Sequence, residues 1–363
     1  MADKYWVGGT GNWGSGGSAF WSLTSGGTGG AGAPSPTEDA YFDANSGGGI
    51  CTISSANQGA LNLSFTGFSG TSNYGGTLTQ SGLGSLQVYG NITYSPSMTM
   101  LPLNLTLLGI GTHTITTNGI FDILTNYINI LTIAGAGTTV YTLVGKLYAA
   151  SISHTWGTFN TGNYDIACGS FVGSLANAKF LNLGSSTIFI GGSGASTYLP
   201  QNTTINAGTS TIKFINTANT NISLATGGYP YYNIWFDRGA STGINALTTS
   251  SGGTTFSGSF IDTGTAAHTI TFQTLRTWIF GDFRVRGSAG NIINIQSNSG
   301  TSAASFSKNP LGLISCDYIA VTLINANPLT NTWYAGANST LTSTTGWIAT
   351  PPPPRKLGAS GAG

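Results

Sequence analysis

Three short stretches of the chain can be laid over one another, and their spacing limits the folds it can adopt. They read WFDRGAS at 235–241, FIDTGTA at 260–266 and FRVRGSA at 283–289. Each is an alternating strand followed by a turn, with a glycine at its fifth position. A repeat of about 24 residues that holds several short strands is typical of a β-solenoid. The shared glycines are Gly239, Gly264 and Gly287.

The composition favours strands over helices along the whole chain. Charged residues make up 6% of the 363, against about 25% in an ordinary soluble domain. Glu38 is the one glutamate, and no segment has the mixture of Ala, Leu, Glu and Lys that a long helix uses. Threonine, isoleucine, valine, phenylalanine and tyrosine recur instead, and these residues are common in strands.

The sequence therefore predicts an all-β fold, a parallel β-solenoid. Roughly a dozen coils of ~24 residues would form a rod on the order of 60 Å long. In such a fold like residues line the interior in columns, asparagines form ladders and glycines occupy tight corners. A pair of β-sandwiches with many hairpins also gives short strands and remains an alternative. The matched turns favour the solenoid.

The charge balance argues against two classes of partner. Eleven basic and ten acidic residues leave a net charge of +1, and no Lys/Arg cluster is larger than a pair. Binding to phosphates needs several basic groups on one face, so we expect no nucleic-acid partner. The longest uncharged stretch, 44–121, is interrupted throughout by polar residues, so we expect no membrane span. The N-terminal residues show no secretory signal.

Metal ligands and cofactor motifs are not evident. The cysteines are odd in number and lack a C-x-x-C pair, which argues against a disulfide framework and a zinc site. The acidic trio in PTEDAYFDAN matches no calcium loop and suits turn capping. No histidine has a partner at ligand spacing, so we expect neither metal nor cofactor. The residues concerned are Cys51, Cys168, Cys316, Glu38, Asp39, Asp43, His113, His154 and His268.

Two aspartates are the weak candidates for catalysis. Asp237 and Asp262 occupy equivalent positions in two of the matched stretches, so they are expected to stack about 5 Å apart on adjacent coils. That separation suits the carboxylate pair of a retaining glycosidase. The competing interpretation is that each aspartate opens a turn, with nearby arginines pairing to it. It is favoured because Asp282 falls out of phase, and we predict that the chain is not an enzyme.

Aromatic residues are dense in GYPYYNIWF at 228–236. A patch of this kind can stack on sugar rings, dock a neighbouring subunit or pack in the core. The residues predicted to contact a glycan or a subunit are Tyr229, Tyr231, Tyr232 and Trp235.

The two ends differ from the middle. Residues 1–49 hold Trp6, Trp13 and Trp21 among glycines, which suggests a cap on the first coil, because an uncovered solenoid end exposes core and strand edges. We expect the solenoid body at 50–350 and a Pro/Gly-rich tail at 351–363.

The end segments also carry a resemblance. The closing line, with DY at 317–318, WYAGANS at 333–339 and GW at 346–347, resembles the C-terminal end of β-helical virion proteins of tailed bacteriophages. The opening YWVGGTGNW, with its following FWS, is similar to the start of the same group. The middle of the chain shares with that group only its short strands rich in Gly, Thr and Asn. The residues expected to serve in closure or assembly are Trp6, Trp13, Trp21, Trp333, Tyr334 and Trp347.

The resemblance implies a right-handed β-helix in a non-enzymatic virion structural protein. Such a protein would be displayed on the particle as capsid decoration or as a head or tail fibre or spike. It implies a homotrimer, other virion proteins as partners and assembly in the host cytoplasm. An alternative is an appendage that binds or cleaves host surface glycans. A bacterial adhesin is a third possibility, disfavoured by the missing signal.

Overall fold

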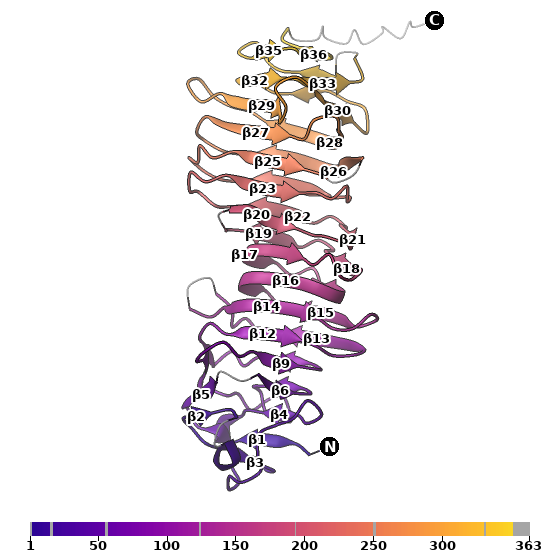
Figure 1. The fold of residues 1–363 in the computed structure, drawn as a ribbon. Helices are drawn as coiled ribbons and strands as arrows, with labels where there is room; N and C mark the ends of the chain where they lie inside the picture. The colour runs from indigo at the N-terminus through magenta and orange to yellow at the C-terminus, as the bar shows by residue number, and fades with distance from the viewer. Residues whose placement is uncertain are drawn as a thin grey trace, which may run out of the picture.

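The chain folds into a rod of stacked coils (Figure 1). The computed structural model describes residues 2–14, 17–54, 57–122, 125–192, 194–249, 252–329 and 332–350. It is an all-β parallel solenoid of about 13 turns, which confirms the predicted fold. The helices in the described part are two short 3-10 turns, η1 (Gly17–Phe20) and η2 (Ala44–Ser46).

One ladder of strands runs through the N-terminal half of the rod. Its members pair in parallel, each about one coil after the last. They are β1 (Lys4–Trp6), β4 (Ala40–Tyr41), β7 (Leu63–Ser64), β10 (Ile92–Thr93), β13 (Thr112–Thr116), β15 (Val140–Val144), β16 (Leu147–Asn160), β18 (Lys179–Asn182) and β21 (Thr203–Asn206).

A second ladder continues along most of the length. It also passes through the long strand β16, because the coil turns a corner within that strand. Its other members are β6 (Gln58–Ala60), β9 (Leu86–Val88), β12 (Asn104–Leu107), β14 (Ile128–Ala134), β17 (Ile166–Gly173), β19 (Thr187–Ile190), β22 (Thr211–Phe214), β24 (Asn233–Phe236), β26 (Gly253–Asp262), β28 (Thr277–Val285), β30 (Ala304–Lys308) and β33 (Ile324–Asn327).

Shorter ladders complete the coils. One leaves β17 and holds β20 (Gly194–Leu199), β23 (Ile222–Ala225), β25 (Asn245–Thr248), β27 (His268–Phe272), β29 (Ile293–Ser297), β32 (Ile319–Thr322) and β35 (Thr340–Thr342). Near the N-terminus lie β2 (Gly11–Asn12), β5 (Ile50–Ile53), β8 (Thr77–Gln80) and β11 (Thr99–Met100). Near the C-terminal end lie β31 (Ile314–Ser315), β34 (Trp333–Tyr334) and β36 (Trp347–Ile348).

The interior is built from columns of like side chains, as the alternation predicts. In the second ladder each inward residue sits directly over the next, and every member of the column is at most 1% exposed. The column consists of Leu147, Ile166, Ile188, Ile212, Ile234, Phe260 and Phe283. In another column of the same ladder, the rings of Phe214 and Phe236 stack with centroids 5.0 Å apart.

Asparagine ladders mark the outer surface, also as predicted. Asn182 donates from Nδ2 to Oδ1 of Asn160 over 2.6 Å, and Asn160 donates to Oγ1 of Thr142 over 3.2 Å.

The three glycines that the sequence aligns are not equivalent in the structure. Gly239 has a left-handed φ of 54°, but Gly264 and Gly287 do not lie in that region. The three turns share a glycine for different reasons.

No helix among the described residues could cross a membrane, since none is long and apolar enough. The tail predicted at 351–363 lies outside the described residues.

Candidate functional site

The predicted stacking of Asp237 on Asp262 is wrong. The strands pair with Phe236 opposite Asp262 and Trp235 opposite Ile261, one residue away from the alignment of the two sequences. A shift of one residue moves a side chain to the other face of a strand. Asp237 therefore lies on the outer surface and Asp262 inside the rod, so no glycosidase-like carboxylate pair forms between them.

Asp237 is held in an outward polar cluster. Its Oδ2 lies 2.8 Å from Nζ of Lys213, and its Oδ1 accepts a hydrogen bond of 3.0 Å from Oγ1 of Thr263. The bond to Lys213 is the main reason that the pKa of Asp237 is lowered. The Lys213 ammonium also sits 3.6 Å from the ring centroid of Trp235, a cation–π contact. Asp237 is thus a paired carboxylate, but its cation is Lys213 and not one of the arginines that the sequence suggested.

Asp262 belongs to a buried ionic network. It is 5% exposed, and its Oδ2 lies 3.0 Å from Nε2 of His268. Asn245 connects this pair to Arg238. Its Nδ2 donates to Oδ2 of Asp262, and its Oδ1 accepts a hydrogen bond of 2.7 Å from Arg238. The guanidinium of Arg238 also donates to three backbone carbonyls of the neighbouring coil and to the carbonyl of Gly243. A carboxylate enclosed in this way stabilises the interior and does not meet a polymeric substrate.

Asp282 and the two arginines that follow it also form ion pairs with nearby groups. Arg284 Nε contacts Oδ2 of Asp282 at 2.6 Å, and Arg286 reaches Asp317 at 3.6 Å. Both arginine side chains are largely exposed, so these pairs contribute at most about 1 kcal/mol each.

The aromatic patch at 228–236 does not form the predicted common surface. Tyr231 is 1% exposed and packs between Tyr198 and Phe256 in the core, so its contact role is wrong. Tyr229 is half-buried and its hydroxyl accepts a hydrogen bond from the Thr203 amide over 3.2 Å.

The other two residues of the patch are partly exposed. The backbone carbonyl of Tyr232 accepts a hydrogen bond of 2.9 Å from the amide of Gly258. Trp235 donates from Nε1 to Thr263 over 2.9 Å, and Lys213 covers its ring. The patch fails as a unit because Tyr231 turns into the core while the other three rings stay partly exposed, and only Trp235 lies in strand β24.

The N-terminal tryptophans form a single aromatic cluster. Trp6, Trp13 and Trp21 are each 0% exposed, and each packs against Phe42 with ring centroids 5.5 to 5.7 Å apart. β3 (Trp21–Ser22) pairs antiparallel with β1, whereas β1 pairs in parallel with β4. The segment 1–49 thus supplies the first coil as well as its cover.

The C-terminal aromatics close the other end. Trp333 is 0% exposed, and its ring lies 5.1 Å from that of Trp347, which is 7% exposed. Trp333 Nε1 donates to the carbonyl of Asn327 over 2.9 Å. Tyr334, the next residue, alternates to a partly exposed position.

Two of the acidic trio, Glu38 and Asp43, serve turns, and Asp39 bonds to the next coil. Asp43 caps η2 by accepting from the Asn45 amide over 2.9 Å. Glu38 accepts from the Ser35 amide, and Asp39 accepts from Asn62. Within the described residues, no group of three or more His, Cys, Asp or Glu side chains could hold a metal ion.

Neither the cysteines nor His154 offers a reactive group. The three cysteines are free and buried, and burial raises the pKa of both Cys168 and Cys316 to about 12. Burial lowers the pKa of His154 to about 4, so that imidazole is neutral. A neutral thiol or imidazole inside the rod packs as an apolar group.

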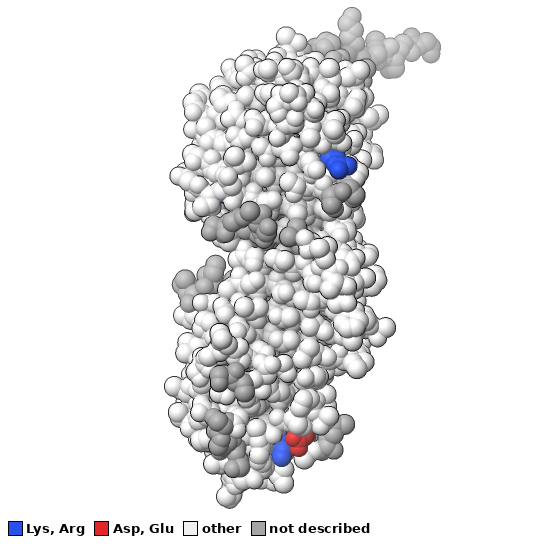
Figure 2. Space-filling model, viewed as in Figure 1, with Lys and Arg blue, Asp and Glu red and all other residues white. Residues whose placement is uncertain are grey.

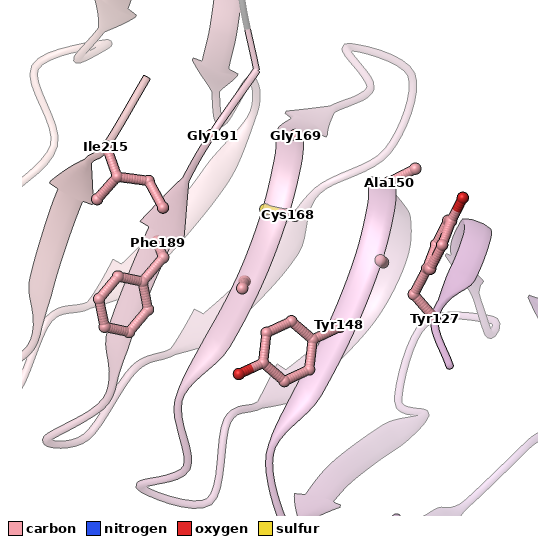
Figure 3. Close-up of a pocket in the computed structure, with 10 residues that line it drawn as sticks. Tyr127, Tyr148, Ala150, Cys168, Gly169, Phe189, Gly191 and Ile215 are labelled. Atoms are coloured by element: carbon pink, nitrogen blue, oxygen red, sulfur yellow. The ribbon is translucent and has the colours of Figure 1, made fainter. Parts of the chain in front are cut away.

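Sequence reasoning missed a groove on the outer face of β16, β17 and β19. Its volume is about 290 Å³, and its lining is mainly apolar. In Figure 3 the rings of Tyr148 and Phe189 show their faces, whereas Tyr127 stands edge-on beside Ala150. The sequence holds one partial signal: Tyr148 and Phe189 take the outward position between two buried neighbours in an alternating strand. That pattern does not show that the two rings share a groove.

Charges are scarce on the surface around these features. In the face shown in Figure 2, one basic and one acidic group adjoin near the N-terminal end, and one basic group lies nearer the C-terminal end. The rest of that face carries uncharged side chains in the described residues.

Comparisons with known proteins identify no relative. No protein-family model matches the chain, and neither the curated proteins nor the solved structures gave a match. The similarity of the two ends to bacteriophage virion proteins therefore stays a prediction.

Proposed function

We propose that this chain is a non-enzymatic structural protein on the surface of a bacteriophage particle. It acts as capsid decoration or as a head or tail fibre or spike, through self-assembly and docking to other virion proteins. Its working form is a homotrimer that needs no cofactor. The observation that carries the proposal is the long parallel rod with tryptophan clusters closing both ends.

The end segments connect this fold with the virion resemblance. The residues that resemble virion proteins are those that build the two closures, around Trp6 and Trp13 at one end and Trp333 and Trp347 at the other. The shared motifs are therefore explained by one physical task, covering the open ends of a solenoid.

The polar groups support a structural role over glycan cleavage. Asp237 and Asp262 face opposite sides of one strand wall, and both have protein partners. A rod with few titratable surface groups also keeps its charge nearly constant as the pH changes. Glycan binding without cleavage is favoured by one separate observation, the aromatic groove beside Ala167.

The decisive experiment asks whether the chain is part of a particle. Particles from a producing culture are banded on a density gradient, and the chain is quantified by mass spectrometry against the major capsid protein. We expect the chain to band with intact particles. Hundreds of copies per particle would mean decoration, and a few dozen or fewer would mean a fibre or spike. Recovery only in the unassembled protein fraction would refute the proposal.

A further inference from the structure

The groove exists because one column of outward rings is interrupted. Tyr148, Ala167 and Phe189 lie in register on three successive coils. Coils stack at about 4.8 Å, so the two rings are roughly 10 Å apart along the rod. Ala167 leaves the coil between them without a ring, and Figure 3 shows the open floor that results.

The floor is made of small residues, and the fold does not require all of them to be small. A Cβ on Gly169 would lie 2.6 Å from the carbonyl oxygen of Ala150, so the backbone demands glycine there. A Cβ on Gly191 would meet nothing closer than 3.8 Å, and its φ is outside the left-handed region. Packing and backbone geometry therefore leave the glycine at 191 unexplained, whereas an open groove explains it.

The lining selects an uncharged ligand. None of the residues that line the groove is an acid or a base, and burial keeps the Cys168 thiol neutral by raising its pKa to about 12. The nearest cation in the column is Lys213, whose ammonium lies 5.9 Å from the ring centroid of Phe189. Its charge is paired with Asp237, and its closer ring contact is with Trp235. Nucleic-acid platforms combine stacking rings with a positively charged groove, which this surface lacks.

The rings and hydroxyls favour a sugar. A pyranose presents a face of C–H groups that stacks on an aromatic ring and a rim of hydroxyls that need polar partners. Tyr148 and Phe189 offer ring faces, and the hydroxyls of Tyr127 and Tyr148 bond to no protein group among the described residues. Apolar walls with a few polar atoms are the usual make-up of a small-molecule site.

We propose that the groove between Tyr148 and Phe189 binds a neutral saccharide unit of a glycan, with Tyr127 as its side wall. The ring faces stack on the sugar and the tyrosine hydroxyls hydrogen-bond to its rim. This binding site goes beyond the scaffold role and does not depend on it, because it concerns a surface that neither end closure uses.

The test measures binding of neutral oligosaccharides to the full chain by calorimetry. The probes are maltohexaose, cellohexaose and chitohexaose, and we expect at least one to bind. At Gly191 an added Cβ meets no atom closer than 3.8 Å, so we expect Gly191→Val to fill the floor and to weaken that binding at least tenfold. Phe189→Ala should weaken it to a similar extent. Tyr148→Phe removes only a hydroxyl and should have a smaller effect.

Phe180→Ala serves as the matched control. Phe180 is an outward ring on β18, 48% exposed, in a different ladder from the groove. It should leave the affinity unchanged, and circular dichroism should show all four variants folded. The proposal is overturned if none of the three probes binds, or if Gly191→Val binds as well as the unchanged chain. A changed oligomeric state in Gly191→Val, without sugar binding by the parent, would assign the groove to a subunit contact instead.

Discussion

Asp262 and His268 form a buried pair inside the solenoid, with Oδ2 of the carboxylate 3.0 Å from Nε2 of the imidazole. Nδ1 of the same ring lies 2.8 Å from the carbonyl of Ala266. Both ring nitrogens thus face oxygen atoms that can accept hydrogen bonds, an arrangement that suits the doubly protonated ring. Burial opposes the charged ring, but the hydrogen bond and charge of Asp262 raise the pKa of His268 above its ordinary value.

The first prediction is a loss of stability on the alkaline side. A histidine whose pKa is raised on folding contributes stability that is complete below about pH 6.5 and is lost as the pH rises through the raised pKa. The midpoint of urea denaturation should fall as the pH increases from about 6 to about 9. In His268→Gln this fall should be smaller, and an equal fall in both proteins would contradict the assignment.

His154 should give the opposite dependence. Burial lowers its pKa to about 4, and its Nε2 donates to the carbonyl of Gly157 over 3.2 Å. Its stability contribution is therefore present above about pH 6.5 and is lost as the pH falls towards 4. Denaturation of His154→Gln should depend less on pH in that range. If His268→Gln flattened the same acidic range, the two assignments would have to be exchanged.

The two aspartates that the sequence aligns should respond differently to the same substitution. Asp262→Asn breaks a buried charged pair, which typically costs about 3–5 kcal/mol. Asp237→Asn weakens a contact with Lys213 at a partly exposed site, worth at most about 1 kcal/mol. Urea denaturation at neutral pH measures both.

Each variant of that pair controls for the other. They share the chemistry of the change and differ in the face on which the side chain lies. Equal losses of stability would mean that the two carboxylates are in like environments. Loss of a glycan-cleaving activity in Asp237→Asn, with the fold intact, would overturn the non-enzymatic proposal.

The sequence contains enough information for the fold but not for the register. Strands can be identified because inward and outward side chains alternate with a period of two. Coils can be identified because turns recur each time the chain completes a coil and begins the next. In FIDTGTA the alternation places Phe260 inward, and therefore Asp262 as well. Aspartate is rarely buried in a protein core, so the sequence alone argues against that position. Its partner His268, six residues later, and the hydrogen bonds from Gly264 and Asn245 make that position acceptable.

The groove was beyond prediction because coil length varies. Tyr148 and Ala167 are 19 residues apart, whereas Ala167 and Phe189 are 22 apart, although both pairs are adjacent in one column. Turns absorb these differences at little energetic cost. The sequence shows that each ring faces outward but not which rings share a column.

The matched glycines allow a further test of the turns. At Gly239 an added Cβ meets nothing closer than 3.6 Å, but φ is 54°. Gly239→Ala should therefore cost about 1–2 kcal/mol through backbone strain alone. At Gly287 the same Cβ would lie 2.3 Å from the carbonyl oxygen of Tyr318. Gly287→Ala should thus lower the thermal midpoint more than Gly239→Ala, and the reverse order would refute these turn geometries.

The last prediction concerns the N-terminal closure. The ring of Trp21 packs edge-on against Trp13 at 4.8 Å and Trp6 at 5.3 Å, and its Nε1 donates to the carbonyl of Trp13. Trp21→Ala removes the centre of the cover, at a cost of about 3–5 kcal/mol. It also uncovers strand edges that can pair with other chains.

Light scattering should therefore show growing assemblies of Trp21→Ala on mild warming, before the rest of the rod melts. Trp156→Ala removes a ring that is 37% exposed on the side of the rod and should stay unassociated under the same conditions. If both variants associated equally, exposed hydrophobic surface in general would be the cause. Association confined to Trp21→Ala means that the cover's purpose is to keep the first coil from pairing end to end.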